Sequence, residues 1–208
     1  MPAPQAAVAV IAIAGPSGGG KTTLVQHVAA LLDNATQVLF DDYAAVSTYP
    51  DDLSRWVATD ADPTQWQTPR LADDLRALRM GVPVLHPGGT TLLQPTHYIV
   101  MEEPFGRERQ EMAPLIDFVV VIDVPLEIAL ARRIQRTFTR GLEQWSAEQV
   151  LGLVDSYLQE YIAWGSALYS IVNSRALASC DLAVDGRQPA KQLAEQIAMA
   201  VRRRFASA

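Results

Sequence analysis

Short apolar segments alternate with longer segments of helical periodicity along the chain. The apolar segments predict five strands, at residues 8–14, 37–40, 98–101, 118–122 and 182–184. The first and fourth are almost wholly apolar, which is typical of strands that helices cover on both faces. Alternation of strands and helices indicates a parallel sheet built from strand–helix–strand units. We therefore expect a single α/β domain, residues 1–208, with a central, mostly parallel five-stranded sheet.

Capping residues predict where several helices begin and end. Thr68 is a predicted N-cap before a helix that starts at Pro69 and stops at Gly81. Ser146 begins a capping box that opens a helix reaching about residue 170, and Pro189 opens the last helix. These signals lie between the predicted strands, as the α/β pattern requires.

Two stretches, residues 47–68 and 82–96, have no clear periodicity. In an open α/β sheet, ligands bind beyond the carboxyl ends of the strands, so these stretches are the expected substrate-side loops. His86 lies in the second stretch and is a candidate for contacting a substrate. A histidine that merely packs in the loop is the alternative.

The first predicted strand leads directly into a glycine-rich segment with the spacing G-x-x-x-x-G-K-T. The segment is Gly15, Pro16, Ser17, Gly18, Gly19, Gly20, Lys21, Thr22 and Thr23. In a turn between a buried strand and a helix, this spacing predicts a phosphate-binding loop whose backbone N–H groups surround phosphates. Lys21 is expected at the β- and γ-phosphates of ATP, and the Thr22 hydroxyl at a magnesium ion. The alternative is an ordinary glycine-rich turn.

Carboxylates follow two of the predicted strands. Asp41 and Asp42 come after the second strand, and Glu102 and Glu103 follow the third. Both pairs should lie at the sheet edge where the phosphate loop opens, where a carboxylate can accept a proton from a hydroxyl or support a metal ion. Asp41 is the closer of its pair to the strand, although Asp42 stays open as the base. Adjacent side chains on extended backbone point to opposite faces, so we expect only Glu102 to face the site.

A predicted helix after Pro125 carries a row of arginines. Arg133, Arg136 and Arg140 lie three and seven positions apart, which places them on one helical face. Such a row can close over phosphates and neutralise charge in a transition state. The alternative is a solvated charged face.

Composition narrows the classes of partner. The chain has 17 basic and 23 acidic residues and a net charge of −6, which disfavours a nucleic-acid partner. A single cysteine excludes an internal disulfide framework. No apolar run approaches the ~20 residues that span a bilayer. We therefore expect a cytoplasmic enzyme without a membrane partner, whose oligomeric state stays open.

The order of the motifs resembles the uridine kinase and phosphoribulokinase-like branch of P-loop kinases. Residues 41–43 are similar to the D-x-F-Y segment of that family, and residues 66–81 to its W…P…L…DL…L…G helix. The strand that ends in Glu102 resembles the family's strand ending in E-G, and residues 116–136 resemble its I-D…D…RR-x-x-R run. The resemblance extends to residue 186 and covers most of the chain.

The resemblance implies a three-layer P-loop NTPase fold with a helical lid, and a reaction that uses ATP and Mg²⁺. It implies that Asp41 is the general base and part of the magnesium site, and that Glu102 supports the metal. Arg133, Arg136 and Arg140 then belong to the lid and substrate region, with Arg136 in a catalytic role. Tyr43, His86, Arg133 and Arg140 are the expected contacts of the acceptor substrate.

The sequence departs from the family pattern at three places, all in segments that recognise the acceptor substrate in that family. Glu103 stands where the family has glycine, Leu142 replaces an arginine, and the hairpin before the third strand is reduced to residues 82–96. We therefore expect a small-molecule kinase that phosphorylates a hydroxyl of a nucleoside or sugar-like metabolite. A pantothenate-like or sugar-derivative acceptor is the alternative within enzymes. A regulatory NTPase that acts through a protein partner is the alternative outside them.

Overall fold

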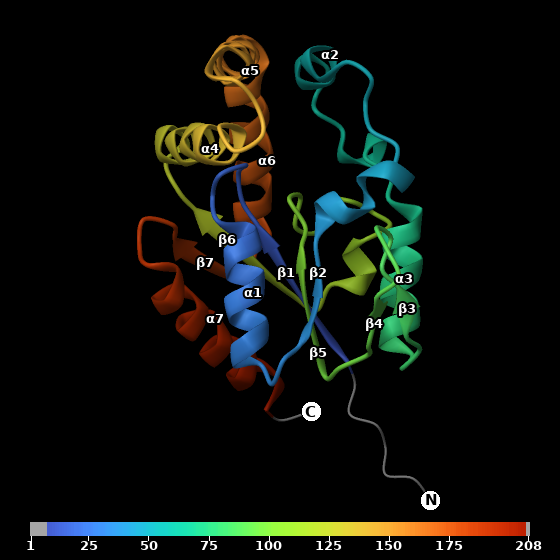
Figure 1. Cartoon of the computed structure of the whole chain (residues 1–208). Helices are drawn as coiled ribbons and strands as arrows, with labels where there is room; N and C mark the ends of the chain where they lie inside the picture. The colour runs from blue at the N-terminus through green and yellow to red at the C-terminus, as the bar shows by residue number, and fades with distance from the viewer. Residues whose placement is uncertain (1–7, 207–208) are drawn as a thin grey trace, which may run out of the picture.

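A computed structural model describes residues 8–206, so the ends of the predicted domain, 1–7 and 207–208, lie outside it. The five predicted strands form one parallel sheet in the order β2-β5-β1-β6-β7 (Figure 1). Their bounds are β1 Ala9–Ala14, β2 Thr36–Val38, β5 Tyr98–Glu102, β6 Phe118–Asp123 and β7 Leu182–Asp185. This confirms the predicted three-layer α/β P-loop fold.

Alternation along β1 divides the core into two layers. Ile11 and Ile13 point to one face, where α1 (Lys21–Leu31) and α7 (Ala190–Phe205) cover the sheet. Val10 and Ala12 point to the other face, which packs against α3 (Pro69–Arg79) and α6 (Ser166–Ala178). Every residue of β1 is buried, because both faces are covered. β1 is therefore the middle strand of the sheet, and the loop that follows it lies at the carboxyl edge.

The predicted helices are present, but the structure differs from the prediction at the end of one helix and at the cap of another. The capping box of Ser146 opens α5 (Ala147–Glu160) as predicted, but the helix does not end near residue 170. It continues through a π-helical turn, Tyr161–Gly165, into α6, which ends at Ala178. Helix α3 begins at Pro69, whereas the Thr68 side chain does not cap it: its hydroxyl contacts Glu111 and Arg109.

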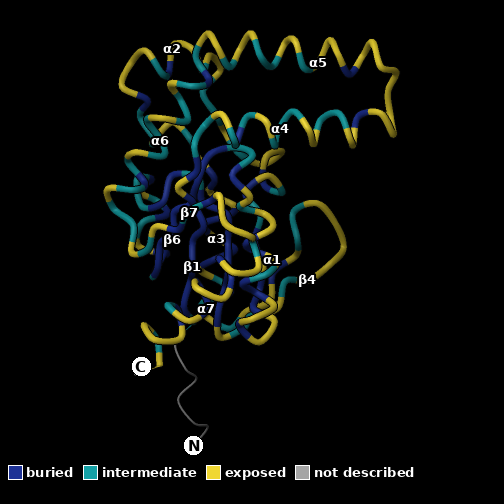
Figure 2. Tube along the Cα trace, turned by 90° about the vertical axis from the view of Figure 1, so that its left-hand side faces the viewer, coloured by how far each residue is buried: buried dark blue, intermediate teal, exposed yellow. Residues whose placement is uncertain are grey.

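The predicted helical lid is an arm of two helices. Helices α4 (Leu126–Gly141) and α5 pack side by side in antiparallel directions and project from the body of the protein (Figure 2). Residues of this arm are mostly exposed or half-buried, in contrast to the buried sheet. The arm begins directly after β6, so its base lies beside the phosphate loop.

The remaining elements are short, and all but η3, which lies between β5 and β6, fall in the two irregular stretches or beside them. They are η1 (Phe40–Val46), α2 (Leu53–Ala58), η2 (Pro63–Gln65), the hairpin β3 (Val84–Leu85) and β4 (Leu92–Leu93), and η3 (Ala113–Leu115). Within residues 8–206, no helix combines the length and apolar character needed to cross a membrane.

Candidate active site

The loop between β1 and α1 has the backbone that its glycines predict. Gly15, Gly18 and Gly20 have φ of 145°, 83° and 100°, a region that L side chains rarely adopt. A Cβ on Gly18 would lie 2.1 Å from the carbonyl oxygen of Ala129, so α4 touches the loop there. No side chain among residues 8–206 caps the start of α1, which leaves its first N–H groups free to bind an anion.

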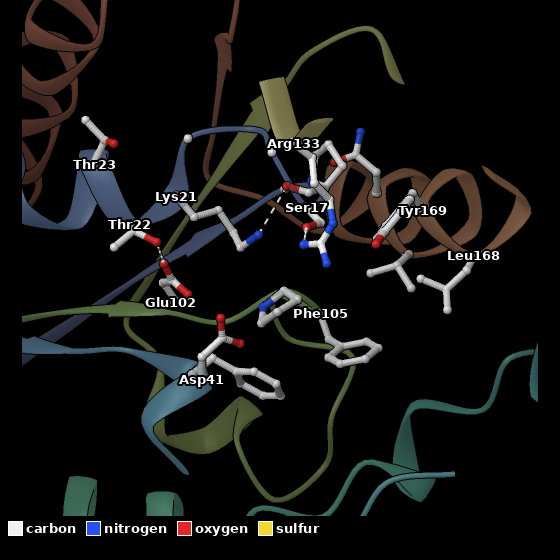
Figure 3. Close-up of a pocket in the computed structure, with 18 of the residues that line it drawn as sticks. Ser17, Lys21, Thr22, Thr23, Asp41, Glu102, Phe105, Arg133, Leu168 and Tyr169 are labelled. Carbon is white, nitrogen blue, oxygen red and sulfur yellow. Dashed lines mark hydrogen bonds between the residues drawn. The ribbon is translucent and has the colours of Figure 1, made fainter. Parts of the chain in front are cut away.

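Four side chains from three elements meet at this loop (Figure 3). Thr22 of α1 donates its hydroxyl hydrogen bond to Glu102 Oε1 at the end of β5. Asp41 of η1 points its carboxylate into the same space, which Lys21 enters from the first turn of α1. Lys21 Nζ donates to the carbonyl oxygen of Pro16 at 3.2 Å. Burial lowers the pKa of Lys21, while the negative charges of Glu102 and Asp41 oppose that shift.

Each pair of adjacent carboxylates is divided between two environments. Glu102 faces the loop, whereas Glu103 is buried against Arg109, as the alternation of extended backbone predicts. Asp41 lines the cavity, whereas Asp42 lies beside His86, 2.9 Å from His86 Nε2. The structure therefore brings Asp41 and Glu102, and not their neighbours, next to Lys21.

Two of the predicted arginines reach the site from α4. Arg133 Nη1 donates to Ser17 Oγ at 2.7 Å, and its guanidinium carbon lies 4.6 Å from the centre of the Tyr157 ring. Arg136, one turn further along, also lines the cavity. Their positive charges lower the pKa of Lys21 further, so Lys21 lies among four other charged residues.

The charged groups surround one end of a cavity of about 380 Å³. Its other end is largely apolar and aromatic. The residues there are Phe40, Trp66, Pro104, Phe105, Leu168, Tyr169, Val172 and Asn173. Sequence reasoning missed this wall, because its members come from loops and a helix that are far apart in the chain. The spacing of the four α6 residues, at i, i+1, i+4 and i+5, was the one usable signal, since it marks a single helical face.

Three residues predicted to contact the acceptor lie outside this lining. Tyr43 belongs to η1 and is buried, and its hydroxyl donates to Asp74 Oδ2 at 3.0 Å. His86 sits in the β3–β4 hairpin with Asp42. Arg140 is exposed in the last turn of α4. The structure thus brings together Lys21, Asp41, Glu102, Arg133 and Arg136, but not these three.

A second cavity, of about 410 Å³, borders the last glycines of the phosphate loop and the first turn of α1. It is lined by residues of the loop, by Arg132 and by the segment from Gly186 to Pro189 between β7 and α7. Both terminal nitrogens of Arg132 lie 3.0 Å from the Gly186 carbonyl oxygen, so the arginine is fixed at this cavity.

Oxygen ligands for a magnesium ion are available at the loop. Magnesium prefers hard oxygen ligands and keeps several waters, so one or two protein groups are enough when phosphates supply the others. Thr22 and Glu102 already contact each other, and Asp41 lines the same cavity. Within residues 8–206, no group of three or more His, Cys, Asp and Glu side chains forms a metal site without such help.

Comparison with known proteins agrees with the predicted resemblance. A uridine kinase from Borreliella burgdorferi (strain ZS7) is 26% identical over 167 residues, which cover 75% of this chain and 77% of that enzyme. A uridine kinase from Borrelia garinii subsp. bavariensis is 25% identical over the same length. No protein-family model matches the chain. The predicted similarity to uridine kinases is therefore confirmed by these relatives.

A solved structure supports the fold. A protein described as a fructose transport system kinase, from Silicibacter sp. TM1040, superposes with a TM-score of 0.51. The two chains are 16% identical, and the match covers 88% of this chain and 93% of the other. At this identity the likeness concerns the arrangement of helices and strands.

Proposed function

We propose that this protein is an ATP-dependent kinase that transfers the γ-phosphoryl group to a hydroxyl of a nucleoside or sugar-like metabolite. One observation carries the proposal: Lys21, Asp41 and Arg136, from three separate elements, line one cavity at the phosphate loop. Phosphoryl transfer needs positioning and charge neutralisation more than covalent chemistry, and these residues supply both. The uridine kinase relatives support a small-molecule acceptor.

In this proposal each residue has a distinct role. The phosphate loop from Gly15 to Thr23 holds the β- and γ-phosphates of ATP, with Lys21 as the nearest point charge. Asp41 accepts the proton that the acceptor hydroxyl loses. Arg133 and Arg136 neutralise charge that spreads over the transferred group. Thr22 and Glu102, with Asp41 beside them, would hold Mg²⁺, which supplies further positive charge at the phosphates when bound.

In this proposal the acceptor and the base of the nucleotide bind in different cavities. The cavity of about 380 Å³ lies beside Asp41 and is therefore the acceptor's place, with a ring or carbon skeleton against the aromatic wall. The second cavity, beyond the phosphate loop at Arg132, is the place for the base of the nucleotide. The phosphates then lie between them. Because its donor is ATP and its acceptor a metabolite, we assign the enzyme to the cytoplasm.

A screen of acceptors tests the proposal. The protein is incubated with ATP, magnesium and one candidate at a time, with ADP release and the mass of the product as readouts. The panel contains nucleosides, including uridine, sugar alcohols, a sugar derivative and pantothenate. A product heavier by one phosphoryl group identifies the acceptor. Uridine is expected to react poorly or not at all, because Glu103, Leu142 and the shortened segment 82–96 depart from the family pattern in parts that recognise the acceptor. A hydrogen-bonding pocket can separate close analogues by orders of magnitude.

A regulatory NTPase is the alternative function. Such a protein needs no acceptor cavity next to its base, and its ADP release responds to a protein partner and not to a metabolite. If no candidate metabolite stimulates ADP release and a protein partner does, the regulatory NTPase would replace the kinase as the proposed function.

Arg136→Ala is expected to lower the rate of transfer more than it weakens nucleotide binding. The charge on the transferring group is spread most widely in the transition state, so a cation that stabilises it acts mainly on the rate. We expect kcat to fall by roughly 10²-fold, the scale of one lost electrostatic contact, with little change in ADP affinity. Arg140→Ala is the matched control, because Arg140 lies on the same helix but outside the cavity lining. Equal loss in rate and in nucleotide binding for Arg136→Ala would indicate a ground-state contact, and no effect at all would favour a merely solvated face.

A further inference from the structure

A buried ion pair lies behind the aromatic wall of the acceptor cavity. Arg109 and Glu103 both belong to the loop after β5, and their side chains are 1% and 0% exposed. Glu103 accepts hydrogen bonds from Arg109 Nε, at 3.1 Å, and from Arg109 Nη2. Neither residue lines the cavity, and the proposed transfer reaction uses neither directly.

Arg109 also joins its loop to the segment that carries Trp66. Its Nη1 donates to the Trp66 carbonyl oxygen at 3.0 Å and to Thr68 Oγ1 at 2.7 Å. Glu111 strengthens the connection, since it accepts from the Thr68 backbone N–H at 2.8 Å. The backbone of Trp66 is therefore fixed by the guanidinium.

The same guanidinium lies between two aromatic rings of the wall. Its central carbon is 5.4 Å from the centre of the Phe40 ring and 5.8 Å from that of Phe105. The rings continue from Phe40 to Tyr49 at 6.2 Å, from Tyr49 to Trp66 at 4.8 Å and from Trp66 to Phe105 at 5.3 Å. Arg109 thus closes a ring of four aromatic side chains. Phe40 directly precedes Asp41, so the position of the proposed base depends on this ring.

Stability alone is a poor explanation for this arrangement. Removing two charges from water is costly, and replacing a buried ion pair by apolar side chains of similar volume is often neutral or stabilising. The guanidinium, however, offers five donors in one plane together with two faces that stack on aromatic rings. Only an arginine can bind Glu103, Trp66 and Thr68 while it packs between Phe40 and Phe105.

We propose that Arg109, oriented by Glu103, is a positioning residue that holds Phe40, Trp66 and Phe105 at the acceptor end of the cavity. Through Phe40 it also sets the position of Asp41. The inference rests on the proposed kinase function for its kinetic consequence. It predicts a defect on the acceptor side only, because none of the contacts of Arg109 involves the phosphate loop.

Arg109→Lys tests this inference with Arg107→Lys as the matched control. Arg107 lies two residues away and also pairs with an acid, Asp181, at 2.7 Å. It binds the backbone carbonyls of Ser179 and Asp117, however, and it does not line the cavity. Lysine keeps the charge in both variants and removes the planar set of donors. Three quantities are measured for each protein: kcat/KM for the acceptor found in the screen, the Kd of ADP, and the tryptophan bands of the near-ultraviolet circular dichroism spectrum.

We expect Arg109→Lys to lower kcat/KM for the acceptor by about tenfold, the scale of one lost charged hydrogen bond. The Kd of ADP should stay within about twofold of the parent value, and the tryptophan bands should weaken as the ring around Trp66 loosens. Arg107→Lys should change none of the three. Loss of ADP affinity in parallel with acceptor efficiency, or equal effects of the two substitutions, would overturn the inference in favour of a general structural role.

The inference can still be tested if Arg109→Lys does not fold or if no acceptor is found. If Arg109→Lys does not fold, Glu103→Gln replaces it, and we expect the same acceptor-side defect at about threefold, as for a hydrogen bond that loses its charge. If the parent protein phosphorylates no candidate, the proposed function fails, and the spectrum alone decides the positioning role. Tryptophan bands that are identical in the parent and Arg109→Lys would then overturn it.

Discussion

Replacing Lys21 by alanine is expected to remove nearly all phosphoryl transfer while leaving the fold intact. Lys21 brings a concentrated positive charge to the phosphates, and Glu102, Asp41, Arg133 and Arg136 act electrostatically on it. Loss of one such group costs roughly 10²- to 10³-fold in rate. The side chain belongs to none of the three hydrophobic clusters of residues 8–206, so the free energy of unfolding should change little.

The measurement combines ATP turnover with circular dichroism. Lys191→Ala is the matched control, since Lys191 is exposed in the first turn of α7, at the start of a different helix. Both variants should give the spectrum of the parent protein, and only Lys21→Ala should lose turnover. Turnover of Lys21→Ala within a few-fold of the parent would remove this lysine from the mechanism.

Asp41→Asn is expected to reduce the chemical step by roughly 10²-fold or more, the scale of a lost general base. Asparagine keeps the shape of the side chain and removes its basicity, so the affinity for ADP should largely persist. Single-turnover rates and ADP binding, measured on the same preparation, separate the two effects.

Asp42→Asn is the control for Asp41→Asn. Asp42 is the adjacent acid, but it contacts His86 outside the cavity lining, so its substitution should be milder. Should Asp42→Asn prove the more damaging change, the assignment of the base would pass to Asp42.

Much of the fold could be predicted because its signals are local. The continuous apolar run of β1 and the glycines of residues 15–20 specify a buried strand and a left-handed turn without reference to any other segment. The lid was harder to delimit. A π-helical turn at Tyr161–Gly165 lets the helix continue past its predicted end, and no residue type marks such a turn in advance.

The candidate site could be predicted where its residues lie at strand ends or, like Arg133 and Arg136, share one face of a helix. Glu102 and Asp41 come after parallel strands, whose carboxyl ends meet at one sheet edge, so their proximity follows from topology. Phe40, Trp66 and Phe105 meet through loops of irregular backbone. Their contact depends on Arg109, whose hydrogen-bond partners lie up to 43 positions away in the chain, and periodicity carries no information on such contacts.

The fate of the γ-phosphoryl group tests the central claim most directly. ATP is labelled with heavy oxygen in its γ-phosphoryl group and incubated with the protein, magnesium and the acceptor found in the screen, and all phosphorylated products are analysed by mass. The kinase account predicts that the label appears in a phosphate ester of the acceptor, and that Asp41→Asn suppresses this product. Label found only in inorganic phosphate, at a rate that the acceptor does not change, would contradict it.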